Sequence, residues 1–248
     1  MNAATTWAHF WWILLPYISM VVFVLGHVWR WRYDRFGWTS YSTELQEKSW
    51  LKWGAPLFHY GTFAAIAGHV MGIMIPKAWT DALGISEHAY HVFAAGAGLL
   101  AAALVIVGMC VLAARRLFVP RVKSTTSPVD WVALVLLGIM VVLGIAVTVW
   151  NVPQGHAYRE TIAIWFRGLF TASADVETAQ EAPLIFEIHA IAAWLLFMIW
   201  PFTRLVHAWS YPLWYLWRPY IVYRSRVPAR TNEPGTSGRR WRKIGAKF

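Results

Sequence analysis

The chain has 248 residues, of which 58% are hydrophobic, 17% aromatic and only 14% charged, and its formal net charge is +10. Soluble globular domains carry about 25% charged residues, so this composition excludes an ordinary soluble enzyme and indicates an integral membrane protein. A positive charge of this size suits either a nucleic-acid partner or a membrane topology, and the positions of the basic residues distinguish the two.

Five apolar runs are long enough to cross a bilayer, which takes about 20 helical residues each. The predicted spans are Trp7–Trp29, Trp53–Ile75, Tyr90–Ala113, Val129–Trp150 and Pro183–Ser210. Pro16 predicts a kink in the first span. Ser127, Pro128 and Asp130 predict the start of the fourth span, as N-cap, first helical residue and first-turn acid. The predicted fold class is therefore all-α, with five transmembrane helices.

The basic residues predict the orientation of these helices. Most of the 22 Lys and Arg residues follow span one, follow span three or lie in the C-terminal tail, all on one side of a five-helix topology. The opposite side has Lys77, Arg159 and Arg167. The positive-inside rule then predicts an outer N-terminus and a cytoplasmic C-terminus. The net charge needs no nucleic acid, and it suits anionic lipid or a cytoplasmic partner.

Two segments outside the spans carry predictions of their own. Residues 159–170, RETIAIWFRGLF, predict a short helix on the membrane surface, with a buried loop helix as the alternative. Residues 1–226 form the predicted membrane domain, and residues 227–248 a basic cytoplasmic tail that is flexible or ordered only on a partner. The first residues lack a basic n-region, so we expect no cleaved signal peptide.

Four histidines lie within the predicted spans: His59 and His69 in span two, His189 and His207 in span five. An ionisable side chain in hydrocarbon is costly, which makes it a functional-site hypothesis. The two helices are antiparallel, so His59 matches His207 in depth near the cytoplasm, and His69 matches His189 near the exterior. Each pair is suited to hold one haem iron by two imidazoles. The lone Cys110 and the absence of C-x-x-C-H exclude a covalently attached haem and a cysteine-ligated cluster.

The spacing of these histidines leaves alternatives open. Ten residues cover about 15 Å of helix and eighteen cover about 27 Å, so the pairs require slanted ligand axes or tilted helices. Eighteen residues are also five turns of about 3.6 residues, which predicts one helical face for His189 and His207. His9 and His27 in span one are eighteen apart as well. A zinc or proton-transport site usually recruits carboxylates, and only Glu187 comes near.

Two features beside the histidines have two interpretations each. Gly61, Gly68, Gly72 and neighbouring alanines leave room for a flat macrocycle beside span two, or they serve close helix packing. Arg204 lies three residues before His207, where its guanidinium is expected to pair with a haem propionate. The alternative is that its side chain extends to the cytoplasmic face of the membrane.

Six motifs follow one another along the chain: LPYI at 15–18, RYD at 32–34, LFH(x)9H at 57–69, RRLF-x-PRV-x-STT at 115–126, F-x-IH at 186–189 and PFTRL-x-HAWS at 201–210. This series, in this order, is similar to that of the gamma, or cytochrome b, subunit of membrane-bound respiratory nitrate reductases. The resemblance covers roughly residues 14–226.

The resemblance implies two b haems, the proximal one on His59 and His207 and the distal one on His69 and His189. It also implies a subunit of the bacterial or archaeal cell (inner) membrane that oxidises quinol near the distal haem and releases the protons outside. Electrons then pass inward to an iron–sulfur beta subunit and a molybdenum-containing alpha subunit on the cytoplasmic face, where the nitrate site lies. A similar haem pair in a nitrite-oxidising or other oxyanion complex, with electrons flowing outward, and a haem-free anchor or transporter are the alternatives.

The quinol site is where the sequence departs from the family pattern. Family members often carry a lysine near the start of span three, but this segment reads SEHAYHVF. His88, Tyr90 and His91 are expected to replace the lysine, because each can donate to a quinone oxygen or accept a quinol proton. Solvent-exposed polar residues at a helix start are the alternative.

Overall fold

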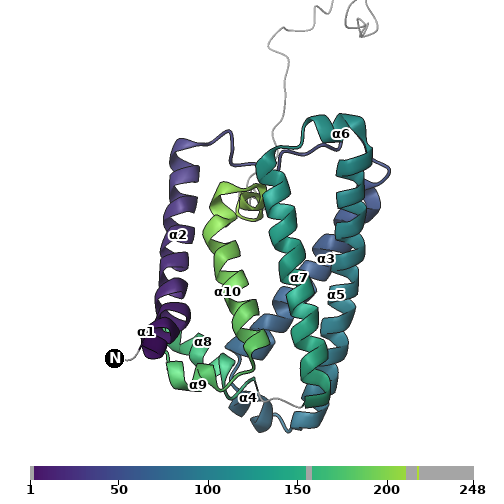
Figure 1. Ribbon diagram of the computed structural model, residues 1–248. Helices are drawn as coiled ribbons and strands as arrows, with labels where there is room; N and C mark the ends of the chain where they lie inside the picture. Colours follow the sequence, from purple (N-terminus) through teal and green to yellow (C-terminus); the bar gives the residue numbers. More distant parts are fainter. Residues whose placement is uncertain (1–2, 155–157, 211–216, 218–248) are drawn as a thin grey trace, which may run out of the picture. The chain divides into compact units, whose positions relative to one another are not determined.

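The computed structural model describes residues 3–154, 158–210 and 217, and residues 1–211 form one compact unit. The second unit, residues 212–248, holds the predicted tail, and residues 227–248 lie outside the described residues. In the described ranges all regular secondary structure is helical (Figure 1). Five helical segments are long and apolar enough to cross a membrane, which confirms the predicted number: Thr6–Tyr33, Leu51–Met74, Glu87–Phe118, Pro128–Pro153 and Leu184–Phe202.

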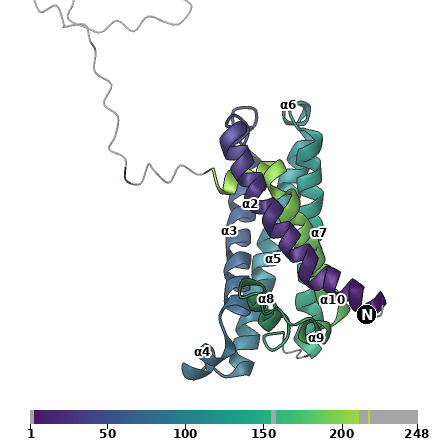
Figure 2. The same ribbon diagram turned by 90° about the vertical axis from the view of Figure 1, so that its left-hand side faces the viewer.

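The spans and their connections follow one another along the chain as a series of named elements. They are α1 (Ala3–His9), the π-helical η1 (Phe10–Leu14), α2 (Leu15–Tyr33), α3 (Leu51–His69), the π-helical η2 (Val70–Met74), α4 (Lys77–Ala82), α5 (Glu87–Phe118), α6 (Pro120–Ser124), α7 (Pro128–Gln154), α8 (Ile162–Phe170), α9 (Val176–Gln180) and α10 (Leu184–Ile199). Two 3₁₀ helices follow, η3 (Trp200–Phe202) and η4 (Arg204–Ala208). Both views place α1, α4, α8 and α9 at one end, the α4 end, and α6 at the other, the α6 end (Figures 1 and 2).

The irregularity in span one has a cause in Pro16. The π-helical turn η1 precedes this proline, which has no N–H to donate to the carbonyl of Trp12 four residues earlier. The indole Nε1 of Trp165 on α8 donates to that carbonyl instead, at 2.8 Å. The two indole rings meet edge to face, with centroids 4.9 Å apart. The predicted disturbance at Pro16 is confirmed, and it serves as the docking point for α8.

Helix α8 matches the predicted helix in residues 159–170, and one of its faces is buried in the protein. Trp165 is 2% exposed and Leu169 3%, and both belong to an apolar cluster with Trp12, Leu15 and Trp194. The other face, with Ile164 and Phe170, is exposed. The helix therefore packs against spans one and five while presenting apolar side chains outward.

Small residues bring α3 and α5 close together. A Cβ on Gly61 would lie 2.7 Å from the backbone nitrogen of Val105, and one on Gly108 would lie 2.3 Å from that of Phe58. Close backbone approach of this kind is the usual role of small residues between membrane helices. Helix α10 packs instead against α2 and α7. The two helices that carry the predicted ligands are thus each supported by different neighbours.

The start of α7 is built as predicted. The Ser127 hydroxyl accepts from the backbone N–H of Asp130 at 3.2 Å, and the Asp130 carboxylate accepts from that of Ser127 at 3.0 Å. This reciprocal arrangement satisfies N–H groups that the first turn leaves without helical partners. The third span is longer than predicted, because Ser86 caps α5 and the helix continues through Arg115 and Arg116.

The prediction of one helix over Pro183–Ser210 is wrong. Helix α10 ends at Ile199, and Thr203 is extended, with φ −114° and ψ 178°, between η3 and η4. Pro201 explains the break, because it cannot donate a backbone hydrogen bond and its ring crowds the preceding turn. His189 and His207 therefore do not share the face of one continuous helix.

Trp165→Phe is expected to lower the free energy of unfolding by about 1–3 kcal/mol, because it removes the donor to a buried carbonyl. Thermal unfolding in lipid nanodiscs, followed by the loss of helical circular dichroism, measures the change. Trp7→Phe is the matched control, since Trp7 is 61% exposed. Equal unfolding midpoints for the two variants would contradict the docking role of the indole.

Candidate functional site

The structure brings the four histidines together in two pairs. The rings of His59 on α3 and His207 on η4 have centroids 6.0 Å apart, and those of His69 on α3 and His189 on α10 are 6.1 Å apart. The first pair lies toward the α6 end of α3 and the second toward the α4 end. These are the pairs that matching depth predicts, and they join spans two and five.

The break in span five accounts for this agreement. Ten residues of α10 separate His189 from Ile199, the same number that separates His59 from His69 on α3. Both stretches advance about 15 Å along their helices. Thr203 is extended, so residues 203–207 do not continue the helical span Leu184–Phe202. The separation of about 27 Å expected for a continuous helix therefore does not arise. The prediction of slanted ligand axes or tilted helices assumed a continuous helix, and the break in span five removes that assumption.

The ring separations fit a shared metal ion. Two imidazole nitrogens at about 2 Å from one iron, each about 1 Å from its ring centre, place the centres about 6 Å apart. Rings joined directly by one N–H···N hydrogen bond would lie nearer, at about 5 Å. Two ligands per site are also what a six-coordinate haem requires, whereas a structural zinc ion takes four protein ligands.

Three of the four rings are oriented by backbone carbonyls. Nδ1 of His59 donates to the carbonyl of Ala55 at 2.7 Å, and Nδ1 of His69 donates to that of Ala65 at 2.7 Å. His207 Nδ1 donates to the carbonyl of Arg204 at 2.5 Å. These bonds leave Nε2 of each ring with a lone pair for a metal, which is the usual arrangement of ligating histidines. Nδ1 of His189 is buried without a hydrogen-bond partner.

The glycines of span two divide between the two interpretations given for them. A Cβ on Gly61 would meet α5, so this residue serves helix packing. Nothing lies within 4 Å of a Cβ on Gly68, next to His69. A Cβ on Gly72 would lie 3.0 Å from the hydroxyl of Tyr158. Of these three glycines, only Gly68, which is exposed, has open space at its Cβ position.

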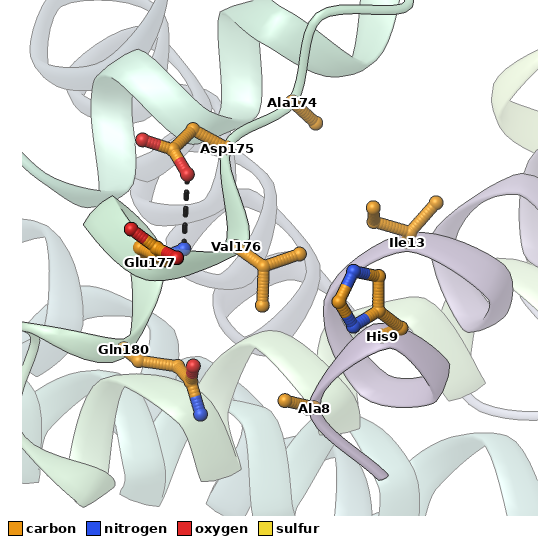
Figure 3. Close-up of a pocket in the computed structure, with 8 residues that line it drawn as sticks. All are labelled: Ala8, His9, Ile13, Ala174, Asp175, Val176, Glu177 and Gln180. Carbon is orange, nitrogen blue, oxygen red and sulfur yellow. Dashed lines mark hydrogen bonds between the residues drawn. The ribbon is translucent and has the colours of Figure 1, made fainter. Parts of the chain in front are cut away.

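The two histidines of span one belong to neither pair. His27 Nδ1 donates to the carbonyl of Phe23 at 2.7 Å, and its ring lies among those of Phe23, Trp38 and Trp209. His9 lines a hollow between α1 and α9, where it faces Val176 (Figure 3). In the structure the histidines of span five pair with those of span two and not with those of span one, a question that the spacing alone left open.

Arg204 has a partner that the sequence did not reveal. Its Nε lies 2.5 Å from Oδ1 of Asp130 at the start of α7, and Oδ2 of the same carboxylate lies 3.7 Å from Nη1 of Arg116. The Asp130 side chain is only 8% exposed. The Arg204 guanidinium is therefore held by an ion pair and does not extend freely to the membrane surface. The two arginines and one carboxylate leave one positive charge near His207, which still suits an anionic group.

The predicted residues His88, Tyr90 and His91 lie in the first two turns of α5 and differ in burial. His88 is exposed. Tyr90 is 6% exposed, and the Arg159 guanidinium lies over its ring, 3.9 Å from the centroid. His91 is partly buried, and its Nε2 has no hydrogen-bond partner.

Arg159 is a buried group that sequence reasoning did not select. It is 3% exposed, its Nη2 donates to the Thr80 hydroxyl at 2.9 Å, and its Nη1 lies 3.7 Å from the Glu87 carboxylate. Its Nε and Nη1 have no hydrogen-bond partner. Burial and a hydrogen bond with Tyr90 raise the pKa of Tyr158, so this hydroxyl stays protonated and available as a donor. The sequence signal was that Arg159 is one of few basic residues on its side of the membrane.

A solvent-exposed ion pair borders this cluster. Lys77 Nζ donates to Oε1 of Glu160 at 2.6 Å and lies 3.9 Å from Oε2 of Glu87. The hydrogen bond and charge of each partner lower the pKa of Glu160 and raise that of Lys77, so both stay ionised around neutral pH.

Known proteins of one family are similar to this chain along most of its length. The family model described as nitrate reductase gamma subunit matches residues 8–226. The nitrate reductase gamma chain of Bacillus subtilis is 45% identical over 216 residues, covering 87% of this chain and 97% of that protein. The respiratory nitrate reductase 1 gamma chain of Escherichia coli is 29% identical, covering 86% and 95%. The nitrate reductase-like protein NarX of Mycobacterium tuberculosis is 40% identical over 92% of this chain but 35% of that protein. The chain, with its five apolar helices and two histidine pairs, belongs to the nitrate reductase gamma subunit family.

Proposed function

We propose that this chain is a membrane dihaem b cytochrome that oxidises quinol at the α4 end and passes electrons to partner subunits at the α6 end. The observation that carries the proposal is the pair of ring separations, 6.0 Å and 6.1 Å, at two depths between spans two and five. A bound b haem supplies reversible one-electron transfer at its iron. The chain's own contribution is to hold the axial imidazoles in place and to exclude other ligands.

The orientation follows from charge. Nine Lys and Arg residues lie in the loops at the α6 end and in the helix ends beside them: Arg30, Arg32, Arg35, Lys48, Lys52, Arg115, Arg116, Arg121 and Lys123. The α4 end has Lys77, Arg159 and Arg167. By the positive-inside rule we place the α6 end in the cytoplasm, the N-terminus outside and the protein in a bacterial or archaeal cell membrane. Arg115 supports a firm inner surface there, since it holds the 34–50 loop through Glu47 and Thr43. We infer that the iron–sulfur beta subunit, and with it the molybdenum-containing alpha subunit that reduces nitrate, docks on this face.

The quinol site would lie at the α4 end, beside the outer histidine pair. Tyr158 reaches Gly72, three residues after His69, so the buried cluster of Arg159, Tyr90 and Tyr158 lies near the outer imidazoles. The guanidinium N–H groups without partners are suited to a quinol or quinone oxygen, and the charge favours the deprotonated oxygen. His91 offers a buried ring nitrogen to accept a proton. Glu87, which pairs with Lys77 and Arg159, lies at the exposed edge where protons can leave.

Each of His59→Ala and His207→Ala is expected to remove the same one of two b haems, and each of His69→Ala and His189→Ala the other. The haem-to-protein ratio of the purified complex, together with its reduced-minus-oxidised spectrum, measures the loss. His27→Ala is the matched control, because His27 shares the Nδ1 bond to a carbonyl but belongs to neither pair. A variant of the four that retains both haems would show its ligand to be misassigned. A wild-type complex whose spectrum lacks a b-type α-band would contradict the haem proposal, and the alternative of a haem-free membrane anchor would remain.

Arg159→Gln is expected to raise the KM for quinol by about 10-fold or more, since hydrogen bonds to charged groups contribute about 1.5–3 kcal/mol. Steady-state reduction of the outer haem by a soluble quinol, at unchanged haem content, measures the effect. Lys77→Gln serves as the control, because this cation lies at the same end and pairs with Glu160 and Glu87. Equal KM values in the two variants would place quinol elsewhere.

A His88→Ala/His91→Ala double variant separates the two predicted imidazoles from Arg159. We expect slower haem reduction with both haems intact, because a proton acceptor is lost at His91. The single His88→Ala variant should resemble the wild type, since His88 is exposed to solvent. Unchanged kinetics in the double variant would remove the histidines from the site.

A further inference from the structure

The imidazole of His207 is supported differently from those of span two. His59 and His69 lie on α3, whose continuous backbone supplies the carbonyls, four residues earlier, that accept from their Nδ1 atoms. His207 lies beyond the break at Pro201, on the short 3₁₀ helix η4, and its Nδ1 donates to the carbonyl three residues earlier, that of Arg204. The position of that carbonyl is therefore not fixed by any long helix.

Side-chain hydrogen bonds shape this segment, and one of them ties it to another span. The Thr203 hydroxyl accepts from the backbone N–H of Leu205 at 3.1 Å, and the indole Nε1 of Trp200 donates to the carbonyl of Leu205 at 2.8 Å. Both bonds stay within the segment itself. The Arg204 side chain supplies an ion-paired tie to another span, through its Nε bond to Asp130 of α7.

Asp130 is itself fixed in place. Its carboxylate accepts from the backbone N–H of Ser127, and its own N–H donates to the Ser127 hydroxyl, so it forms part of the first turn of α7. It also faces Arg116 at the end of α5. The carboxylate thus joins the ends of two spans to the residue whose carbonyl orients His207. An ion pair with side chains only 8% and 19% exposed, on Asp130 and Arg204 respectively, is sensitive to loss of either partner.

We propose that Asp130 is a positioning residue for the inner axial imidazole: through Arg204 it fixes the ring orientation of His207. This inference rests on the proposed function, because it assigns a role relative to a haem held by His59 and His207. Partners of this kind orient the ligand ring and tune the metal, even though they do not touch it. The outer pair has no such tie in the described chain, so the effect should be confined to one haem.

The test is Asp130→Asn in the complete nitrate reductase complex, with ferric haem signals recorded by low-temperature electron paramagnetic resonance. Asn keeps an oxygen for the Ser127 N–H and loses the charge that holds Arg204. We expect the low-field g value and the midpoint potential of the inner haem to shift, with those of the outer haem unchanged. The single-histidine variants assign each signal to its pair. Arg204→Gln should produce the same shift, and the double variant no more than either single one.

Glu47→Gln is the matched control, because Glu47 is another poorly exposed carboxylate at the α6 end that pairs with an arginine, Arg115, and has no bond to η4. Unchanged signals of both haems in Asp130→Asn and Arg204→Gln would overturn the inference, as would an equal shift in Glu47→Gln. If Asp130→Asn does not accumulate in the membrane, Arg204→Gln and Arg204→Lys decide alone. Absence of haem from the wild type would refute the proposed function instead, so the two failures are distinguishable.

Discussion

The arrangement of the whole protein depends on one geometric constraint: two histidine pairs with different spacings in sequence must meet across two antiparallel helices. Pro201 meets that constraint by ending α10 ten residues after His189, so the regular helix has the length that separates His59 from His69. The remaining residues bring His207 beside His59 without lengthening the span. A helix that continued to Ser210 would carry His207 roughly 12 Å further along its axis, and the inner pair would not form.

His207 lies outside a long regular helix, so tertiary contacts, and not the backbone of such a helix, must hold its imidazole in place. On α3 the hydrogen bonds of the helix fix each imidazole, whereas at His207 the same task falls to charged side chains from α5, α7 and η4. Buried ion pairs of this kind contribute little net stability, but removal of one partner is costly because the other charge stays behind. The position of His207 is therefore specified by charge, and those of His59 and His69 by backbone hydrogen bonds of α3.

Length and hydropathy were sufficient to predict the five spans, because a membrane helix must satisfy its own backbone and has a set minimum length. The order of the spans and the basic loops were sufficient to pair the histidines by depth. The π-helical turn before Pro16, the break at Pro201, the Asp130–Arg204 bond and the burial of Arg159 were not predictable, because each depends on a partner far away in the chain. Two incorrect structural expectations, one continuous helix over Pro183–Ser210 and a common face for His189 and His207, came from treating an apolar run as a uniform helix.

The indole of Trp165 that docks onto the carbonyl of Trp12 joins residues 153 positions apart. During synthesis the first span enters the membrane long before its partner exists, with its backbone interrupted at Pro16. Contacts this distant in sequence are slow to form. The N-terminal span should therefore remain loosely associated until α8 and α10 have emerged, because the apolar cluster needs Trp165 and Trp194 as well as Trp12.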